Sequence, residues 1–99
     1  MPVQVDLNNP VFQQAWFNLE KTEKLAVIKT LEKIIQLEWQ EIYHDRGLNW
    51  EAIQSRIGPN GGRVYSLRVT QKMRAVAFRE GQVLRLSDLY PDHDSTYQK

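Results

Sequence analysis

The residues of this sequence that are best suited to chemistry lie in its last third. Arginine recurs there at short intervals, and the chain then reaches a histidine between two aspartates, followed by a tyrosine. The planar guanidinium fork of arginine matches the oxygens of a phosphate, and histidine is the side chain that ordinarily titrates near neutral pH. Such a set is suited to holding and cleaving a phosphodiester. The candidate residues are Arg63, Arg68, Lys72, Arg74, His93 and Tyr97.

Charge is unevenly distributed along the chain, although the net charge is only +1. Residues 1–62 contain six Lys or Arg against eight Asp or Glu, whereas residues 63–99 contain seven against four. The positive charge is therefore concentrated in the stretch that holds the candidate residues, which favours a phosphate-bearing partner. The alternative interpretation is that these arginines only cover a solvent-exposed face.

Three apolar runs of strand length organise this last third. They are separated by polar breaks at residues 70–72 and 80–82, each of hairpin-loop length. The pattern predicts an antiparallel three-strand meander with basic residues on one face. Because side chains alternate between the two faces of a strand, we expect Arg74 to share a face with Val76 and Phe78. Arg79 should lie on the opposite face.

The first half of the chain predicts a short strand and two helices. Residues 3–7 alternate between apolar and polar, as in a strand, and Asn8-Asn9-Pro10 is typical of a helix start. A second helix with one apolar stripe would then continue to Gly47. We expect the two helices to form a hairpin that covers one side of the sheet. The stripe consists of Leu25, Ile28, Leu31, Ile35, Trp39 and Ile42.

The segment between the helices and the meander predicts irregular structure. Residues 47–53 form a connector with two apolar anchors, Trp50 and Ile53, and residues 58–62 form a flexible loop of Gly, Pro and Asn. Helices beside an antiparallel sheet define an α+β fold. At this length we expect one domain, residues 1–99.

Composition limits the remaining classes of function. The chain has no cysteine, which excludes disulfides, thiolate metal sites and a thiol nucleophile. The N-terminus lacks the basic start and apolar run of a secretory signal, and no apolar stretch approaches the roughly 18 residues of a membrane helix. We therefore expect a cytoplasmic protein. The two histidines lack metal-ligand spacing, so we expect no metal cofactor.

The order of these elements resembles the RelE/ParE superfamily of toxins from type II toxin–antitoxin systems. The resemblance spans nearly the whole chain and rests on the segments Gly-Leu-Asn-Trp-Glu (47–51), Tyr-Ser-Leu-Arg-Val (65–69), Met-Arg-Ala-Val-Ala-Phe (73–78) and His-Asp-Ser-Thr-Tyr (93–97). It implies a RelE-like microbial RNase fold, in which an N-terminal strand, a two-helix hairpin and an antiparallel three-strand meander form one sheet.

A RelE-like toxin would be a metal-independent endoribonuclease, or mRNA interferase, that cleaves mRNA, often in the ribosomal A site, and inhibits translation. A cognate antitoxin protein would neutralise it. By position, the resemblance implies that Arg74 stabilises the reacting phosphate and that Tyr97 orients or stacks on the substrate. His93 would be the titrating group, and Arg63, Arg68 and Lys72 would contact RNA phosphates.

Other functions share the same fold. A ParE-like inhibitor binds DNA gyrase and has no catalytic residues, and an inactive relative would act only as a binding module. His93 could also be a surface histidine held by a neighbouring aspartate, and Tyr97 could serve only to anchor the chain end. His44 lies at a predicted helix C-terminus, where a cation is favoured, and is expected to be structural.

Overall fold

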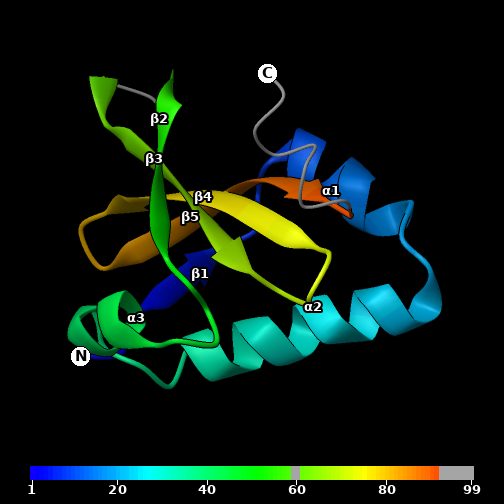
Figure 1. The fold of residues 1–99 in the computed structure, drawn as a ribbon, viewed down its shortest axis with the longest axis horizontal. Coiled ribbons are helices and arrows are strands. Elements are labelled where there is room, and N and C mark those ends of the chain that lie inside the picture. Colours follow the sequence, from blue (N-terminus) through cyan, green and yellow to red (C-terminus); the bar gives the residue numbers. More distant parts are fainter. Residues whose placement is uncertain (59–60, 92–99) are drawn as a thin grey trace.

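The computed structural model describes residues 1–58 and 61–91, which form a five-stranded sheet and three helices (Figure 1). The fold class is α+β, as predicted. The elements are β1 (Gln4–Asp6), α1 (Pro10–Phe17), α2 (Lys21–Ile34), α3 (Trp39–His44), β2 (Glu51–Ile57), β3 (Arg63–Arg68), β4 (Arg74–Glu80) and β5 (Val83–Tyr90).

The sheet is mixed and has the strand order β1-β5-β4-β3-β2. The three predicted strands of the meander correspond to β3, β4 and β5, which pair antiparallel in sequence order. β1 pairs with β5 in the parallel direction, with Val5 opposite Leu84. A further strand, β2, pairs antiparallel with β3 at the other edge. The sheet is therefore larger than the predicted one.

The prediction that residues 47–53 form an irregular connector was wrong in its second half. β2 begins at Glu51, and its pairing with β3 shifts in register between Ala52 and Ile57. Such a shift interrupts the alternation of apolar and polar residues by which a strand is detected in a sequence. The turn before β2 places Asn49 at a φ of 47°, a left-handed conformation that asparagine tolerates.

Capping interactions set the start of the first two helices. The Asn9 side chain accepts hydrogen bonds from two backbone N–H groups of the first turn of α1, and Pro10 is the first helical residue. α2 begins with a reciprocal capping box between Glu20 and Glu23. None of the helices in the described part of the chain is long and apolar enough to cross a membrane.

The second predicted helix is in fact two helices. α2 ends at Ile34, and α3 begins after a second capping box between Glu38 and Glu41. That box satisfies the N–H groups that a new helix start leaves without partners. The three- and four-residue spacing of apolar side chains continues from α2 through residues 35–38 into α3. The break between the two helices therefore cannot be detected from this spacing.

The predicted apolar stripe was also partly wrong, because α2 turns a different side to the core. Val27 and Ile34 are buried, whereas Leu25, Ile28 and Ile35 are 50%, 39% and 49% exposed. Spacing alone cannot distinguish these two sides, since both carry apolar residues at helical intervals. The predicted core positions Trp39 and Ile42 are buried on α3, so the error is confined to α2.

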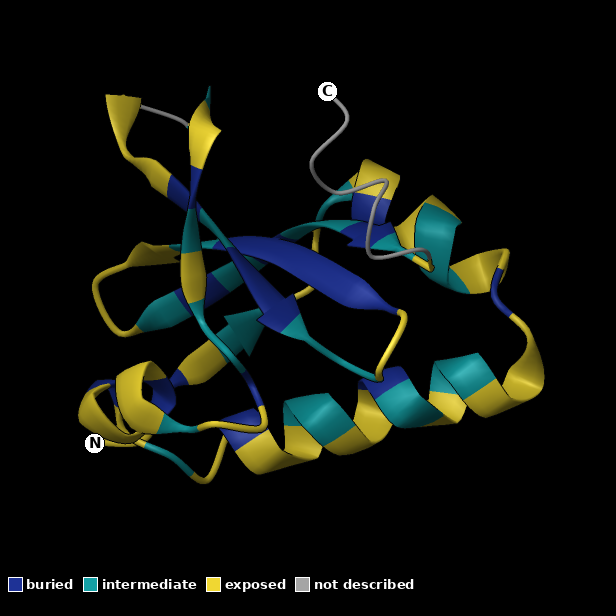
Figure 2. Cartoon of the chain, in the orientation of Figure 1, coloured by how far each residue is buried: buried dark blue, intermediate teal, exposed yellow. Residues whose placement is uncertain are grey.

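Figure 2 shows that the central strand β4 is buried over much of its length. Two apolar clusters pack against the sheet. The larger cluster joins residues of all three helices to Ala75 and Ala77 of β4. The smaller cluster consists of Ile53, Val64 and Val76, with Tyr90 packed beside it. Val76 lies between two members of the larger cluster along β4, so the smaller cluster lies on the opposite face of the sheet. We call this the second face.

An ion pair fixes the turn that follows α3. Asp45 Oδ1 accepts hydrogen bonds from Lys33 Nζ and from the backbone N–H of Leu48, both at 2.9 Å. Burial raises the pKa of the Asp45 carboxyl, but these hydrogen bonds and the charge of Lys33 outweigh burial. The net effect is a pKa below the ordinary value for aspartate.

We expect Asp45→Asn to lower the free energy of unfolding at neutral pH by about 0.5–1 kcal/mol, because the pair is partly exposed. The amide oxygen can still accept the Leu48 N–H, so the change isolates the charge. A carboxyl with a lowered folded pKa stabilises the protein above its unfolded pKa, and this contribution is lost as pH falls through the folded pKa. Urea unfolding of parent and variant should therefore converge in acid; a constant difference would contradict this role.

Candidate functional site

Strand register brings the predicted residues Arg68 of β3 and Arg74 of β4 together on the second face. Arg68 lies opposite Arg74, and Arg74 lies opposite Tyr90. One row away, Ser66 lies opposite Glu51. Opposed residues of antiparallel strands point to the same face, with their Cβ atoms about 4.5–5.5 Å apart. We call Glu51, Ser66, Arg68, Arg74 and Tyr90 the second-face cluster.

Arg74 is the buried centre of this cluster, with a side chain only 1% exposed. Its Nη2 donates to Ser66 Oγ at 2.8 Å, to the Asn49 carbonyl at 3.1 Å and to Glu51 Oε1 at 3.2 Å. Its Nε has no hydrogen-bond partner within the described residues. As predicted, Arg74 lies on the face of Val76. Its guanidinium is held by the protein itself and fixes the start of β2 against β4.

Glu51 is a candidate that the interpretation of the sequence missed. Its side chain is 49% exposed while one carboxylate oxygen lies against Arg74, so the group is both oriented and reached by solvent. A positioned carboxylate can act as a general base. In the sequence, the one feature that pointed to Glu51 was its place at the end of segment 47–51, one of the segments that resemble the RelE/ParE superfamily. Its position on a strand could not be used, because β2 was not predicted.

Arg68 lies opposite Arg74 on β3, and Lys72 precedes Arg74 by two residues in the chain. Neither Arg68 nor Lys72 has an ion-pair partner among the described residues. Arg68 is partly buried at the end of β3, and Lys72 is exposed in the turn between β3 and β4. Thr70 Oγ1 accepts the backbone N–H of Lys72 at 3.3 Å and of Met73 at 3.0 Å, which fixes that turn. These two cations can therefore bind an anion without first breaking an ion pair within residues 1–58 and 61–91.

Arg63 is separated from this group. Alternation along β3 places it with Leu67, which belongs to the larger cluster on the helix side of the sheet. It also lies five residues from Arg68, which corresponds to about 17 Å along a strand. The basic residues therefore do not all share one face, and Arg63 does not contribute to the second-face cluster.

Arg79 lies on the helix side, as predicted, but it is not an isolated surface residue. Its guanidinium lies 4.6 Å from the centroid of the Trp39 ring, and its Nη1 donates to Tyr43 Oη at 2.6 Å. Cation–π stacking of this kind contributes to packing. Substitution of Arg79 would disturb α3, so an exposed cation on α2 is the better control for experiments on the site.

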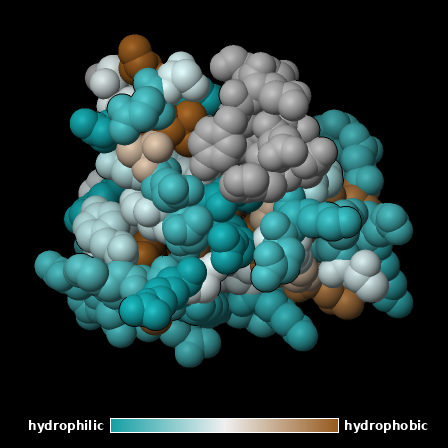
Figure 3. Space-filling model, in the orientation of Figure 1, coloured by the Kyte–Doolittle hydropathy of each residue, from teal (hydrophilic) through white to brown (hydrophobic). Residues whose placement is uncertain are grey.

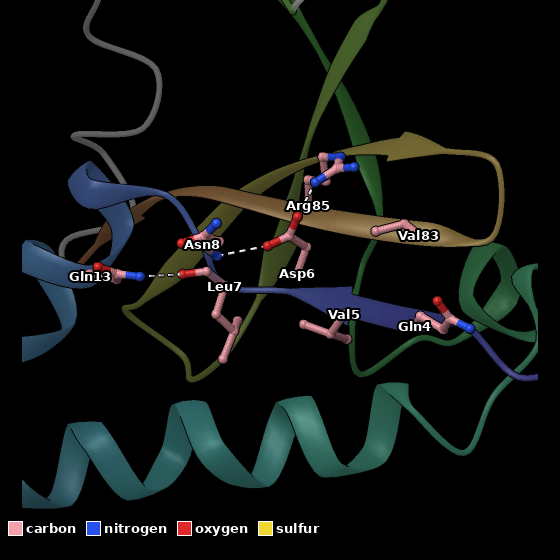
Figure 4. Close-up of a pocket in the computed structure, with 8 residues that line it drawn as sticks. All are labelled: Gln4, Val5, Asp6, Leu7, Asn8, Gln13, Val83 and Arg85. Carbon is pink, nitrogen blue, oxygen red and sulfur yellow. Dashed lines mark hydrogen bonds and ion pairs between the residues drawn. The ribbon is translucent and has the colours of Figure 1, made fainter.

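A hollow at the β1 edge is a weaker candidate for anion binding (Figure 4). Figure 4 shows Asp6 and Arg85 pointing toward each other there, and these two side chains form an ion pair. Arg85 also pairs with Glu80. Arg85 is the one cation among the described residues that line this hollow, and two carboxylates already neutralise it.

Figure 3 shows that polar side chains cover much of the molecular face seen in that view.

His93 and Tyr97, the other two predicted catalytic residues, lie outside the described residues, and their roles remain predictions. His44 does end α3, where its Nδ1 lies 2.8 Å from the Gln40 carbonyl oxygen. Within the described ranges, no group of three or more His, Asp or Glu side chains is arranged to hold a metal ion.

Comparison with known proteins does not assign this chain to a family. No protein-family model matches it, and a search of curated proteins gives no significant match.

Proposed function

We propose that this protein is a metal-independent endoribonuclease of the RelE-like toxin type, which cleaves mRNA and thereby inhibits translation. One observation carries the proposal: Arg68, Arg74 and the carboxylate of Glu51 come together on one face of the sheet. A cation that binds phosphate beside an oriented base is the arrangement that intramolecular cleavage of RNA requires. The order of elements, which resembles the RelE/ParE superfamily, supports the same function.

The proposed reaction transfers the RNA phosphate to the neighbouring 2′-oxygen. Glu51 removes the proton of the 2′-hydroxyl, which then attacks phosphorus and forms a 2′,3′-cyclic phosphate. Arg68 and Lys72 bind the phosphate oxygens, and Arg74 orients Glu51 and offsets the negative charge that develops on the non-bridging phosphate oxygens. The bond to the 5′-oxygen breaks, and His93 supplies the proton to that leaving group. No metal takes part in these steps.

The functional test is induced expression, with transcript ends mapped and plasmid topology measured in the same cells. New 5′ ends within mRNA are the expected result. Altered supercoiling with intact transcripts would instead identify a ParE-like inhibitor of DNA gyrase. Intact transcripts with unchanged supercoiling would leave only a binding role.

A non-catalytic role is the second candidate, and the state of Arg74 favours it. A guanidinium that is 1% exposed and shared among Ser66, Asn49 and Glu51 is also what a purely structural arginine looks like. In that case the cluster would only fix β2, and the chain would act on gyrase or bind an antitoxin without chemistry. Cleavage by the purified protein distinguishes the two functions.

RNA binding through Arg68 and Lys72 should depend strongly on salt. Each neutralised phosphate on a single strand contributes about −0.7 to the slope of log affinity against log salt. We expect Arg68→Ala and Lys72→Ala each to reduce the magnitude of that slope by about 0.7. Fluorescence anisotropy with a labelled single-stranded RNA measures it. Lys29→Ala, on α2, is the control; identical slopes for all four proteins would argue against this RNA-binding surface.

The proposed antitoxin has an apolar groove to occupy between α1 and α2. Phe12, Trp16 and Phe17 line one side and Val27, Ile28 and Leu31 the other. The Lys24 ammonium lies 5.3 Å from the centroid of the Trp16 ring at this groove. An amphipathic helix with an apolar stripe and an acidic residue beside it complements such a surface.

Ile28→Asp should weaken this complex by about tenfold or more, because it places a charge in an apolar interface. The partner to test is the product of an adjacent reading frame, purified by co-expression. Ile28 is 39% exposed in the isolated protein, so the fold should tolerate the change. Ile57→Asp, at a position that is 78% exposed on β2, is the matched control. If Ile28→Asp and Ile57→Asp bind the partner with equal affinity, the partner does not bind in the groove between α1 and α2.

A further inference from the structure

Regular pairing with β3 does not set the position of β2 along its whole length. β2 is an edge strand, and its pairing with β3 is regular at Glu51 and Ala52, shifts, and resumes at Ile57. The middle of β2 therefore lacks a continuous ladder of hydrogen bonds to set its position. Since Glu51 is the proposed base, the placement of this strand decides the geometry of the site.

An ion pair connects β2 to a strand that is not its neighbour. Arg56 Nη2 lies 2.7 Å from Asp88 Oδ2 on β5, although β3 and β4 separate the two strands in the sheet. Figure 1 shows β2 and β3 running across β4 and β5, which brings the ends of the sheet within reach. The Tyr90 hydroxyl lies 3.4 Å from both Arg56 Nη1 and Asp88 Oδ2.

This contact is more than a surface ion pair. The Arg56 and Asp88 side chains are only 28% and 14% exposed, and the smaller apolar cluster lies on the same face of the sheet. Charge pairs that are shielded from solvent are screened less by salt than exposed pairs. Among the described residues, two ion pairs thus connect β2 to strands other than β3: Glu51 with Arg74 of β4, and Arg56 with Asp88 of β5.

We infer that Arg56 and Asp88 are a positioning pair, which holds β2 across the sheet and so sets the Glu51 carboxylate against Arg74. This inference rests on the proposed ribonuclease function. Neither residue needs to touch RNA. The pair should affect the rate of the chemical step, because a small displacement of a catalytic group costs much of its effect. It should leave the affinity for RNA nearly unchanged, since Arg68 and Lys72 lie on β3 and its turn.

The test compares Arg56→Gln, Asp88→Asn, the conservative Arg56→Lys and the exchanged pair Arg56→Asp/Asp88→Arg. Lys33→Gln, which removes an ion pair outside the second face, is the control for general destabilisation. Single-turnover cleavage of a short RNA gives the rate, anisotropy gives the affinity, and amide-hydrogen exchange over β2 reports strand placement independently of activity.

The two single neutral variants should lose about tenfold or more in rate while their RNA affinity changes less than about twofold. Arg56→Lys and the double variant Arg56→Asp/Asp88→Arg should recover most of the cleavage rate. Amide-hydrogen exchange over β2 should be faster than in the parent only in the two neutral variants. The inference would be overturned if both neutral variants cleave RNA at the rate of the parent and also show the amide-hydrogen exchange of the parent over β2. If the parent itself cleaves no RNA, the proposed function fails, and the exchange data alone still decide whether the pair holds β2.

Discussion

Glu51→Gln should abolish RNA cleavage while the fold stays intact. The amide oxygen can still accept the hydrogen bond from Arg74 Nη2, which lies 3.2 Å from Glu51 Oε1 in the parent, but it cannot take a proton from the 2′-hydroxyl. Loss of a general base typically lowers a rate by about 10²–10⁴-fold. Single-turnover cleavage of a labelled RNA measures the rate, and thermal unfolding checks the fold.

Glu32→Gln provides the matched control for this variant, because it makes the same chemical change on the exposed side of α2. It should cleave RNA at the parental rate. If Glu51→Gln is equally active, Glu51 is not the base, and the proton must be taken by another group. His93 would then be the next residue to test.

Arg74→Ala should lose both activity and stability. The arginine is buried, and its removal takes away the Nη2 donor from the Asn49 carbonyl and from Ser66 Oγ. A hydrogen bond from a charged donor contributes about 1.5–3 kcal/mol, so the loss in free energy of unfolding should be about 2–4 kcal/mol in total. The loss of activity in this variant therefore cannot be assigned to catalysis without a measurement of folding.

Arg74→Lys separates the two effects. It keeps a positive charge beside Glu51, but its ammonium cannot reproduce the position and geometry of the guanidinium Nη2 that donates to Ser66, Asn49 and Glu51. We expect it to recover part of the stability but little of the activity. Urea unfolding and single-turnover cleavage of both variants are the measurements. Parental stability of Arg74→Ala would contradict the network described for this residue.

The regular strands could be predicted from the sequence, whereas β2 and the break between α2 and α3 could not. β3, β4 and β5 have apolar runs with polar breaks at hairpin spacing, a local signal that depends on adjacent residues only. β2 is irregularly paired with β3, so its conformation depends on contacts with β4 and β5. The capping box at Glu38 interrupts a helix without interrupting the apolar spacing.

The candidate site was predicted in part. Alternation along β4 correctly placed Arg74 with Val76 and Arg79 on the other side. The partners of Arg74 depend on the register between β2 and β3, and on the left-handed turn at Asn49, which a single sequence does not encode in any local pattern. Glu51 was missed for the same reason. The separation of Arg63 from Arg68, in contrast, follows from alternation along β3, because residues five apart on a strand point to opposite faces.

The most direct test of the central claim is incubation of the purified protein with single-stranded RNA in EDTA, followed by analysis of the product ends. The proposed mechanism predicts cleavage that persists in the chelator and leaves 2′,3′-cyclic phosphate and 5′-hydroxyl ends. Free RNA is used, because ribosomes need magnesium for their integrity. Activity that is lost in EDTA and restored by a divalent ion, or products with 5′-phosphate ends, would contradict it.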